Sequence, residues 1–149
     1  MKIMGECIFC KIINGDIPAA KVYEDDLVTA FLDIAPINYG HVLVIPKEHH
    51  QSVSTVPEKT AGRMLKVASR IGIVLKRRDE YDAYNLHLAD GTAAGQVVMH
   101  AHMHVVPRGV EDNFRWNWRQ LTYPDGKAAE LAKELQEKIT AALAAGEDE

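Results

Sequence analysis

Three histidines alternate with apolar residues in the run His100-Ala101-His102-Met103-His104. Successive side chains of a β-strand point to opposite faces, so the run predicts three imidazoles on one face and Ala101 and Met103 on the other. We expect this strand to span residues 97–106. A lone histidine is commonly a core residue, but three in strict alternation indicate a functional site. The fold must therefore contain a sheet face lined by imidazoles.

The rest of the pattern predicts further strands and two helices. Short apolar runs bounded by turn residues predict strands at 21–24, 27–32, 41–46 and 84–89. In the last of these, His87 faces the same side as Asn85 and is expected to be solvated. Apolar residues at helical spacing predict a long helix over 58–78 and a second that begins at Asp125 and stops at Gly146. The expected fold is α+β, in one domain spanning residues 1–149.

Charge and hydropathy exclude several classes of partner. The formal net charge is −4 without a basic block, so we expect no nucleic-acid partner. No stretch approaches the roughly 18 uninterrupted apolar residues of a membrane span, and the segment before Cys7 lacks the apolar run of a signal peptide. We therefore expect a cytoplasmic protein without a membrane partner. An anionic small molecule would have to be held by a few placed donors.

Two kinds of chemistry suit three imidazoles on one face. Imidazole is a common zinc ligand, and a catalytic zinc would keep one coordination position open. In the other chemistry, one imidazole is a nucleophile and its neighbours bind phosphate oxygens. Charge separates the two poorly, because either site would accept an anionic substrate. The residues around the histidine run are therefore needed to distinguish a zinc site from a nucleophilic site.

Those residues resemble the signature of the histidine-triad (HIT) superfamily, from Gly95-Gln96 through the histidine run to Pro107-Arg108. The likeness continues, in the expected order, in residues 7–13, 22–25, 31–36 and 40–47. It implies a five-stranded antiparallel sheet that joins the sheet of a second copy in a homodimer. It places the motif-bearing core at about residues 5–110 and leaves 111–149 as a variable C-terminal tail and helix.

The resemblance also implies an activity, because members bind purine nucleotides and cleave phosphoramidate or phosphoanhydride bonds to release AMP. By position, His102 is the nucleophile and forms an AMP–imidazole intermediate that water resolves. His41 and His104 would contact phosphate oxygens and stabilise developing charge. The remaining nucleotide-binding residues would be Asp33, which holds the ribose hydroxyls, with Ile34, Gln96 and Val97.

Two positions depart from the family pattern. Many members carry Ser or Thr where this chain has Val97, and valine cannot donate a hydrogen bond to the leaving group or phosphate. The segment Ala89-Asp90-Gly91, where the predicted strand runs into a loop, stands where members often have Asn or Gln in the loop. Assistance to the leaving group must therefore come from elsewhere or be weaker.

The two cysteines predict a second site. Cys7 and Cys10 have the spacing of a zinc-binding pair, although buried free cysteines also serve as small apolar residues. The resemblance implies a structural zinc held by Cys7, Cys10, His49 and His100. Two thiolates and two imidazoles would close a tetrahedral site and leave His102 free for catalysis.

Several functions remain open at this level. The first is a phosphoramidase or nucleotidyl hydrolase that acts through His102, with dinucleoside polyphosphates as alternative substrates. The second is a metallohydrolase in which His100, His102 and His104 hold a catalytic zinc. The third is a non-catalytic nucleotide-binding protein, suggested by the missing hydroxyl at Val97. We rank them in this order.

Overall fold

The computed structural model describes residues 6–146. The chain divides into two compact units, Met1–Asp112 and Asn113–Glu149, and each is described by itself. Most of the segment that argues against a signal peptide lies outside the described residues. Within the described part of the chain, no helix has the length and apolar character that a membrane span requires. The assignment of residues 1–149 to one domain stays a prediction.

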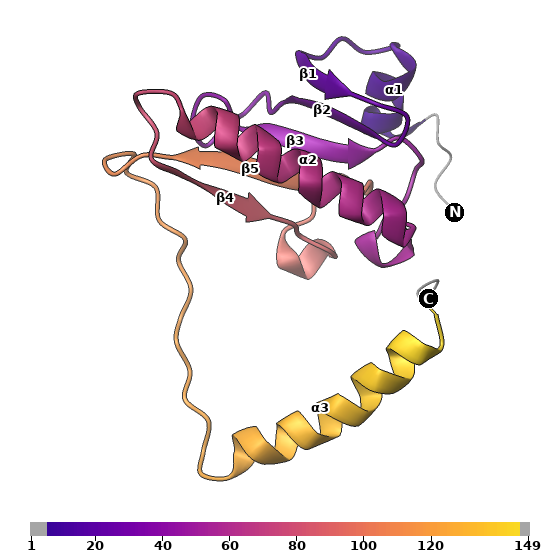
Figure 1. Cartoon of the computed structure of the whole chain (residues 1–149), viewed down its shortest axis with the longest axis vertical. Coiled ribbons are helices and arrows are strands. Elements are labelled where there is room, and N and C mark those ends of the chain that lie inside the picture. The colour runs from indigo at the N-terminus through magenta and orange to yellow at the C-terminus, as the bar shows by residue number, and fades with distance from the viewer. Residues whose placement is uncertain (1–5, 147–149) are drawn as a thin grey trace. The chain divides into compact units, whose positions relative to one another are not determined.

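The first unit is built on a five-stranded antiparallel sheet, which confirms the α+β class (Figure 1). In spatial order its strands are β1 (Lys21–Glu24), β2 (Val28–Leu32), β3 (Val42–Pro46), β5 (Met103–Arg108) and β4 (Ala83–His87). The helices are α1 (Ile8–Asn14) and α2 (Glu58–Lys76), with short 3-10 turns η2 (Val53–Thr55) and η3 (Thr92–Ala94). Strand β5 lies between β3 and the edge strand β4, so the end of the histidine run enters the sheet one strand from its edge.

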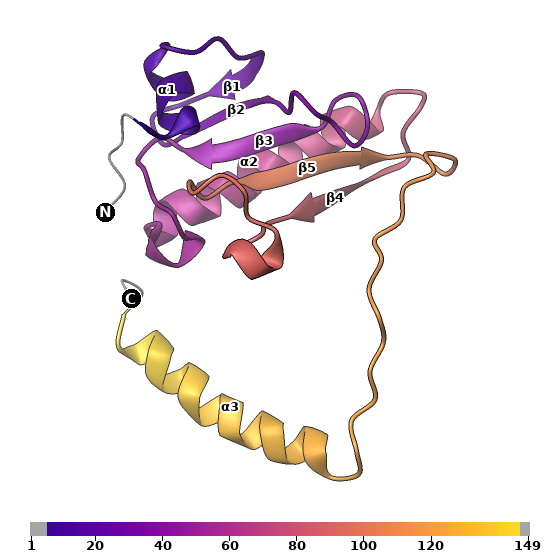
Figure 2. The same cartoon turned by 180° about the vertical axis from the view of Figure 1, so that it is seen from behind.

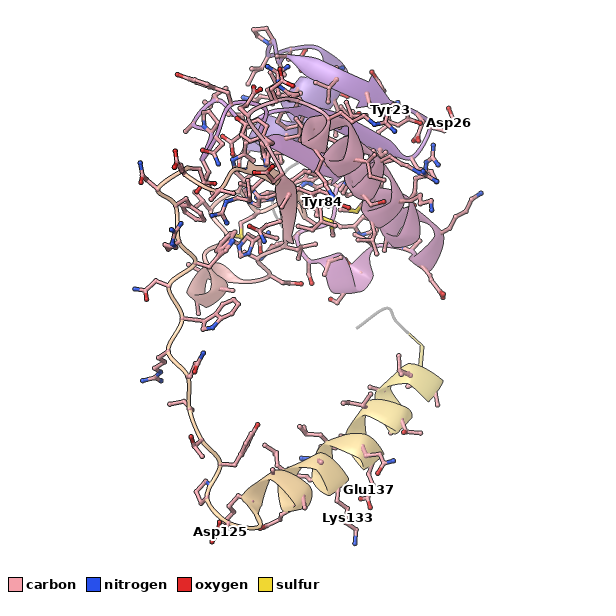
Figure 3. All side chains as sticks on the ribbon, turned by 60° about the vertical axis from the view of Figure 1, so that its left-hand side comes forward. Tyr23, Asp26, Tyr84, Asp125, Lys133 and Glu137 are labelled. Carbon is pink, nitrogen blue, oxygen red and sulfur yellow. The ribbon has the colours of Figure 1, made fainter. Side chains whose placement is uncertain are left out.

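The long helix α2 covers one face of the sheet (Figure 2). Alternate strand residues such as Val42 and Val44 pack there with Met64 and Ala68 of α2. Gly72 allows the helix to approach β4 closely, because a Cβ at this position would lie 2.6 Å from ring atoms of Tyr84, which Figure 3 labels. Packing therefore requires Gly72, although glycine is a poor helix former.

The short helix α1 packs on the other face. Its residues Phe9, Cys10 and Ile12 form a buried cluster with Leu43 and Ile45, which alternate along β3 with the residues facing α2. Strand β3 is buried on both faces, which explains its uninterrupted apolar sequence. This second face carries the histidines.

The predicted strand 97–106 is wrong at its start, because β5 begins only at Met103 and residues 97–102 form an irregular approach. The backbone of this approach pairs locally, and Ala101 donates its N–H to the carbonyl of His50 over 2.7 Å. The alternation of faces is nevertheless confirmed. Ala101 and Met103 pack with the α2 core, whereas His100 and His102 contact Phe9.

The second unit contains α3 (Lys127–Ala144), which confirms the C-terminal helix. Its N-cap is Gly126 and not Asp125, because Gly126 adopts a positive φ of 78° that turns the chain into the helix. Gly146 follows the helix with φ 96°. Leu131 and Leu135 lie on one face at helical spacing, and Lys133 and Glu137 lie on the opposite face (Figure 3).

Candidate active site and metal centre

Three of the predicted catalytic histidines come together where β3 and β5 meet. His41 immediately precedes β3, His102 immediately precedes β5, and His104 lies within β5. The His104 ring centroid is 5.0 Å from that of His102 and 5.1 Å from that of His41. His41 and His102 are buried, with 3% and 7% of their surface exposed. The cluster therefore offers three imidazoles within reach of one small anion.

The backbone fixes the tautomer of His102. Its Nδ1 lies 2.7 Å from the carbonyl oxygen of His100, which can only accept, so Nδ1 carries the proton. The neutral ring then has its lone pair on Nε2. A nucleophilic nitrogen is thus available without a separate base to remove a proton.

A second backbone contact fixes the proton on His41. The backbone N–H of Ile37 donates to His41 Nδ1 over 3.1 Å, so the proton of the neutral His41 ring is on Nε2. His41 Nε2 lies 2.9 Å from His104 Nδ1 and donates to it. His104 accordingly carries its own proton on Nε2. The pair therefore forms a relay that ends in an N–H donor.

Burial keeps these rings neutral. It lowers the pKa of His41 below the ordinary histidine value, with the Asp33 carboxylate acting in the opposite direction. It also lowers the pKa of His102. For His104, burial and the neighbouring His102 and His41 rings lower the pKa to about 4. At neutral pH the cluster therefore holds a nucleophile and donors in their uncharged forms.

The low pKa of His104 predicts a pH-dependent loss of stability. An unfolded histidine titrates near 6.5, so between pH 6.5 and about 4 the unfolded state binds more protons than the folded state. The free energy of unfolding therefore falls as the pH falls through this window. We expect wild type to lose about 2–3 kcal/mol more than His104→Gln between these limits, measured by urea denaturation. Equal pH dependence of the two proteins would contradict this assignment.

The remaining histidine of the predicted strand, His100, belongs to a different group. Cys7, Cys10, His49 and His100 each present one ligand atom, all within 4.8 Å of one another. The Nδ1 atom of His100 lies 3.5 Å from Cys7 Sγ, 3.6 Å from Cys10 Sγ and 3.2 Å from His49 Nδ1. Its Nε2 donates to the carbonyl of Pro46 over 2.8 Å, which leaves the Nδ1 lone pair directed into the group.

This geometry fits a tetrahedral ion. Bonds of about 2.0–2.3 Å to nitrogen and sulfur place ligand atoms roughly 3.3–3.8 Å apart in a tetrahedron, close to the spacings around His100 Nδ1. The Nδ1 atoms of His49 and His100 lie 3.2 Å apart, and a cation held by the four ligand atoms would be shared by both nitrogens. The donor set of two thiols and two imidazoles suits zinc.

A second group, Asp33, His41 and His104, also presents ligand atoms within 4.8 Å. His41 Nε2 lies 3.7 Å from Asp33 Oδ2. Because the backbone contact of Ile37 leaves the proton on His41 Nε2, this nitrogen is a donor and not a metal ligand. The remaining N–H of His104 can therefore donate to an anion, whereas the Asp33 carboxylate can only accept hydrogen bonds, for example from hydroxyl groups.

The other predicted nucleotide-binding residues differ in exposure and in their hydrogen bonds. Asp33 is half-buried and accepts the N–H of Ala35 with Oδ1, while Ile34 and Val97 are 99% and 86% exposed. The buried Gln96 donates both amide hydrogens, to the carbonyls of Gln51 and Val98, and accepts the N–H of Gly91. Its side chain thus holds the loop before β5.

The sequence did not identify two residues beside the cluster as neighbours of the site. Phe9 of α1 lies edge-on to His102 and His100, with ring centroids 5.2 Å and 5.8 Å away. His87 of β4 pairs across the strands with His104, and their ring centroids are 5.6 Å apart. It is half-buried, so the expectation of a solvated His87 is wrong. Its position depends on the β4–β5 register, which the sequence pattern does not specify.

The antiparallel sheet with its helices matches solved structures of histidine-triad (HIT) family proteins. A family model described as "HIT domain" matches residues 14–110. The chain belongs to this family.

Relatives and solved structures match most of the chain. An "Uncharacterized HIT-like protein" of Borreliella burgdorferi is 52% identical over 139 residues, covering 91% of this chain and 100% of that protein. "Adenosine 5'-monophosphoramidase HNT1" of Candida albicans is 36% identical over 140 residues, covering 91% and 92%. A HIT family protein of Bacillus anthracis has a TM-score of 0.82 at 37% identity, covering 89% and 96%. A "ZN-bound histidine triad family protein" of Mycobacterium smegmatis has a TM-score of 0.72 at 33% identity, covering 94% and 99%.

Proposed function

We propose that the protein is a nucleotide hydrolase that attacks the α-phosphate of an AMP conjugate with His102 and releases AMP. The observation that carries the proposal is the contact between His102 Nδ1 and the His100 carbonyl, which leaves the Nε2 lone pair available. The related phosphoramidase of Candida albicans supports a substrate in which AMP is joined through nitrogen. The purine nucleotide and its conjugates are the expected ligands.

The reaction proceeds in two displacements. His102 Nε2 forms a bond to phosphorus as the bond to the leaving group breaks, and Nδ1–H keeps its hydrogen bond to the His100 carbonyl. The resulting phosphoryl-imidazole carries positive charge, so water displaces it readily to give AMP. The N–H at the end of the His41–His104 relay donates to a phosphate oxygen as negative charge develops.

The nucleoside side of the substrate is held by the residues near the start of β3. The Oδ2 atom of Asp33 accepts hydrogen bonds from the ribose hydroxyls, and Ile34 and Val97 border the nucleotide with exposed apolar side chains. Gln96 positions the loop before β5 and does not itself donate to the substrate, because both of its amide hydrogens are donated to backbone carbonyls. Binding energy on this side positions phosphorus against His102.

The same proposal includes a zinc ion on Cys7, Cys10, His49 and His100. Four protein ligands close the coordination sphere, so bound zinc would supply a structural cross-link and no catalytic water. The link would join the start of α1 to the segment before β5. This arrangement also disfavours the metallohydrolase, because the His100 side chain is directed away from His102 and His104 into the cysteine group.

We further propose that the protein is a cytoplasmic homodimer. Strands β1 and β4 are the two edges of the five-stranded sheet, and an edge strand exposes backbone groups that a second copy can pair with. Pairing of this kind joins the two sheets into one and covers the paired edge strand of each copy. Each copy of the dimer then contains its own purine nucleotide site.

Trapping the covalent intermediate tests the proposed mechanism. We expect wild type mixed with adenosine 5′-phosphoramidate and quenched within milliseconds in alkaline denaturant to carry one adenylyl group on the peptide that contains His102. Alkaline conditions are used because phosphoryl-histidine is hydrolysed in acid. Tandem mass spectrometry locates the group. An adduct on His41 or His104, or AMP release without any adduct on a millisecond timescale, would contradict nucleophilic attack by His102.

A further inference from the structure

The side of the cluster opposite Asp33 contains a histidine to which neither the family signature nor the proposed mechanism gives a role. His87 is the last residue of β4, directly across from His104 of β5. Its ring centroid lies 5.6 Å from that of His104, whose own centroid lies 5.0 Å from that of His102. His87 is half-buried in this position. His87 therefore lies directly beside the cluster of His41, His102 and His104.

The strand order determines which part of a substrate His87 can reach. Asp33 follows β2 and donates its backbone N–H to His41, on the β3 side of the histidines. His87 lies on β4, on the other side of β5. If Asp33 holds the ribose and His102 attacks phosphorus, the group on the far side of phosphorus points toward β4. This placement of the leaving group rests on the proposed function.

The leaving group needs a proton donor on that side. Amines and ammonia are poor leaving groups unless nitrogen is protonated as its bond to phosphorus breaks. Val97 has no hydrogen to donate and is 86% exposed, and Ala89 of the same region also lacks a polar side chain. Farther along the same face, Asn85 accepts a hydrogen bond from Arg108 Nη1 over 2.7 Å, and its amide does not give up a proton as an acid would. An imidazole of His87 supplies the missing donor.

We propose that His87 is the general acid that protonates the leaving group. In the first displacement, the His102 Nε2–P bond forms, the P–N bond breaks, and its electron pair takes a proton from the His87 imidazolium. Neutral amine departs and His87 becomes neutral. In the second displacement His87 accepts a proton from the attacking water, the bond between phosphorus and His102 breaks, and AMP is released with His87 protonated again.

Two substrates with the same nucleotide and different leaving groups test this assignment. Adenosine 5′-phosphoramidate needs a proton on its leaving nitrogen, whereas the 4-nitrophenyl ester of AMP loses a weakly basic anion without one. We expect His87→Gln to lower kcat/KM for the phosphoramidate about 10²-fold and to leave kcat/KM for the ester within about threefold. The parameter kcat/KM is used because it reports the steps up to the first bond cleavage.

The ester also shows whether the variant is folded, because the same sample must retain its His102 reaction. Asn85→Ala is the matched control on the same strand and face, and it should leave the ratio of the two kcat/KM values unchanged. Equal losses on both substrates would assign His87 a structural role and overturn the proposal. An unchanged rate with the phosphoramidate would overturn it as well. Failure of wild type on both substrates would instead reject the proposed function.

Discussion

His102→Asn should reduce the kcat/KM for AMP release from adenosine 5′-phosphoramidate at least about 10³-fold. Asparagine can still donate an amide hydrogen to the His100 carbonyl, so it keeps the contact that orients the side chain in wild type. It has no nitrogen lone pair that can form a stable bond to phosphorus. The substitution thus removes the nucleophile with little change to the buried surroundings of the side chain.

Steady-state kinetics have to be combined with binding and metal analysis to interpret this variant. We expect His102→Asn to bind AMP with a Kd within about tenfold of wild type, since Asp33 and the His41–His104 relay remain. Its zinc content and its thermal unfolding should match those of wild type. Equal activity of the two proteins would reject the mechanism. If wild type binds AMP and releases none from phosphoramidates or dinucleoside polyphosphates, the non-catalytic interpretation replaces it.

His49→Gln should abolish zinc binding and lower the stability of the protein. Loss of one of four ligands opens the coordination sphere around Cys7, Cys10 and His100. A structural zinc site contributes folding free energy directly, and we expect a loss of at least about 3 kcal/mol. For a chain of 149 residues this corresponds to a fall in Tm of about 10 °C.

The neighbouring residue provides the control. The Nδ1 atom of His50 lies 3.0 Å from the hydroxyl of Thr55, outside the cysteine group. His50→Gln should therefore retain one zinc per chain, measured by atomic emission on protein purified without added metal. Retention of zinc by His49→Gln, or equal loss in both variants, would contradict the ligand assignment. Chelation of wild type should reproduce the fall in Tm.

The sequence and the fold agree closely in the regions where local pattern is sufficient. Strand β3 was expected at 41–46 and spans Val42–Pro46. The apolar run between Gly40 and the turn after Pro46 is too short for a helix, so a buried strand is the structure that its pattern favours. Helix α2 was expected over 58–78 and ends at Lys76. The start of β5 was missed by several residues. Alternation of polar and apolar residues defines two faces, and it does not require that the backbone pair as a strand.

Chemical identity was determined by the sequence alone: a histidine run with two faces, a cysteine pair at metal-binding spacing, and the order of motifs that resembles the HIT family. The resemblance also implied how the histidines are divided between the two sites, and the tertiary structure decided the contacts by which each histidine is held. It directs the His100 side chain to the cysteines, uses the His100 carbonyl to fix the proton of His102, and brings His87 beside His104. These outcomes depend on strand register and on backbone partners far apart in the chain. Residue spacing along the sequence carries no information about either.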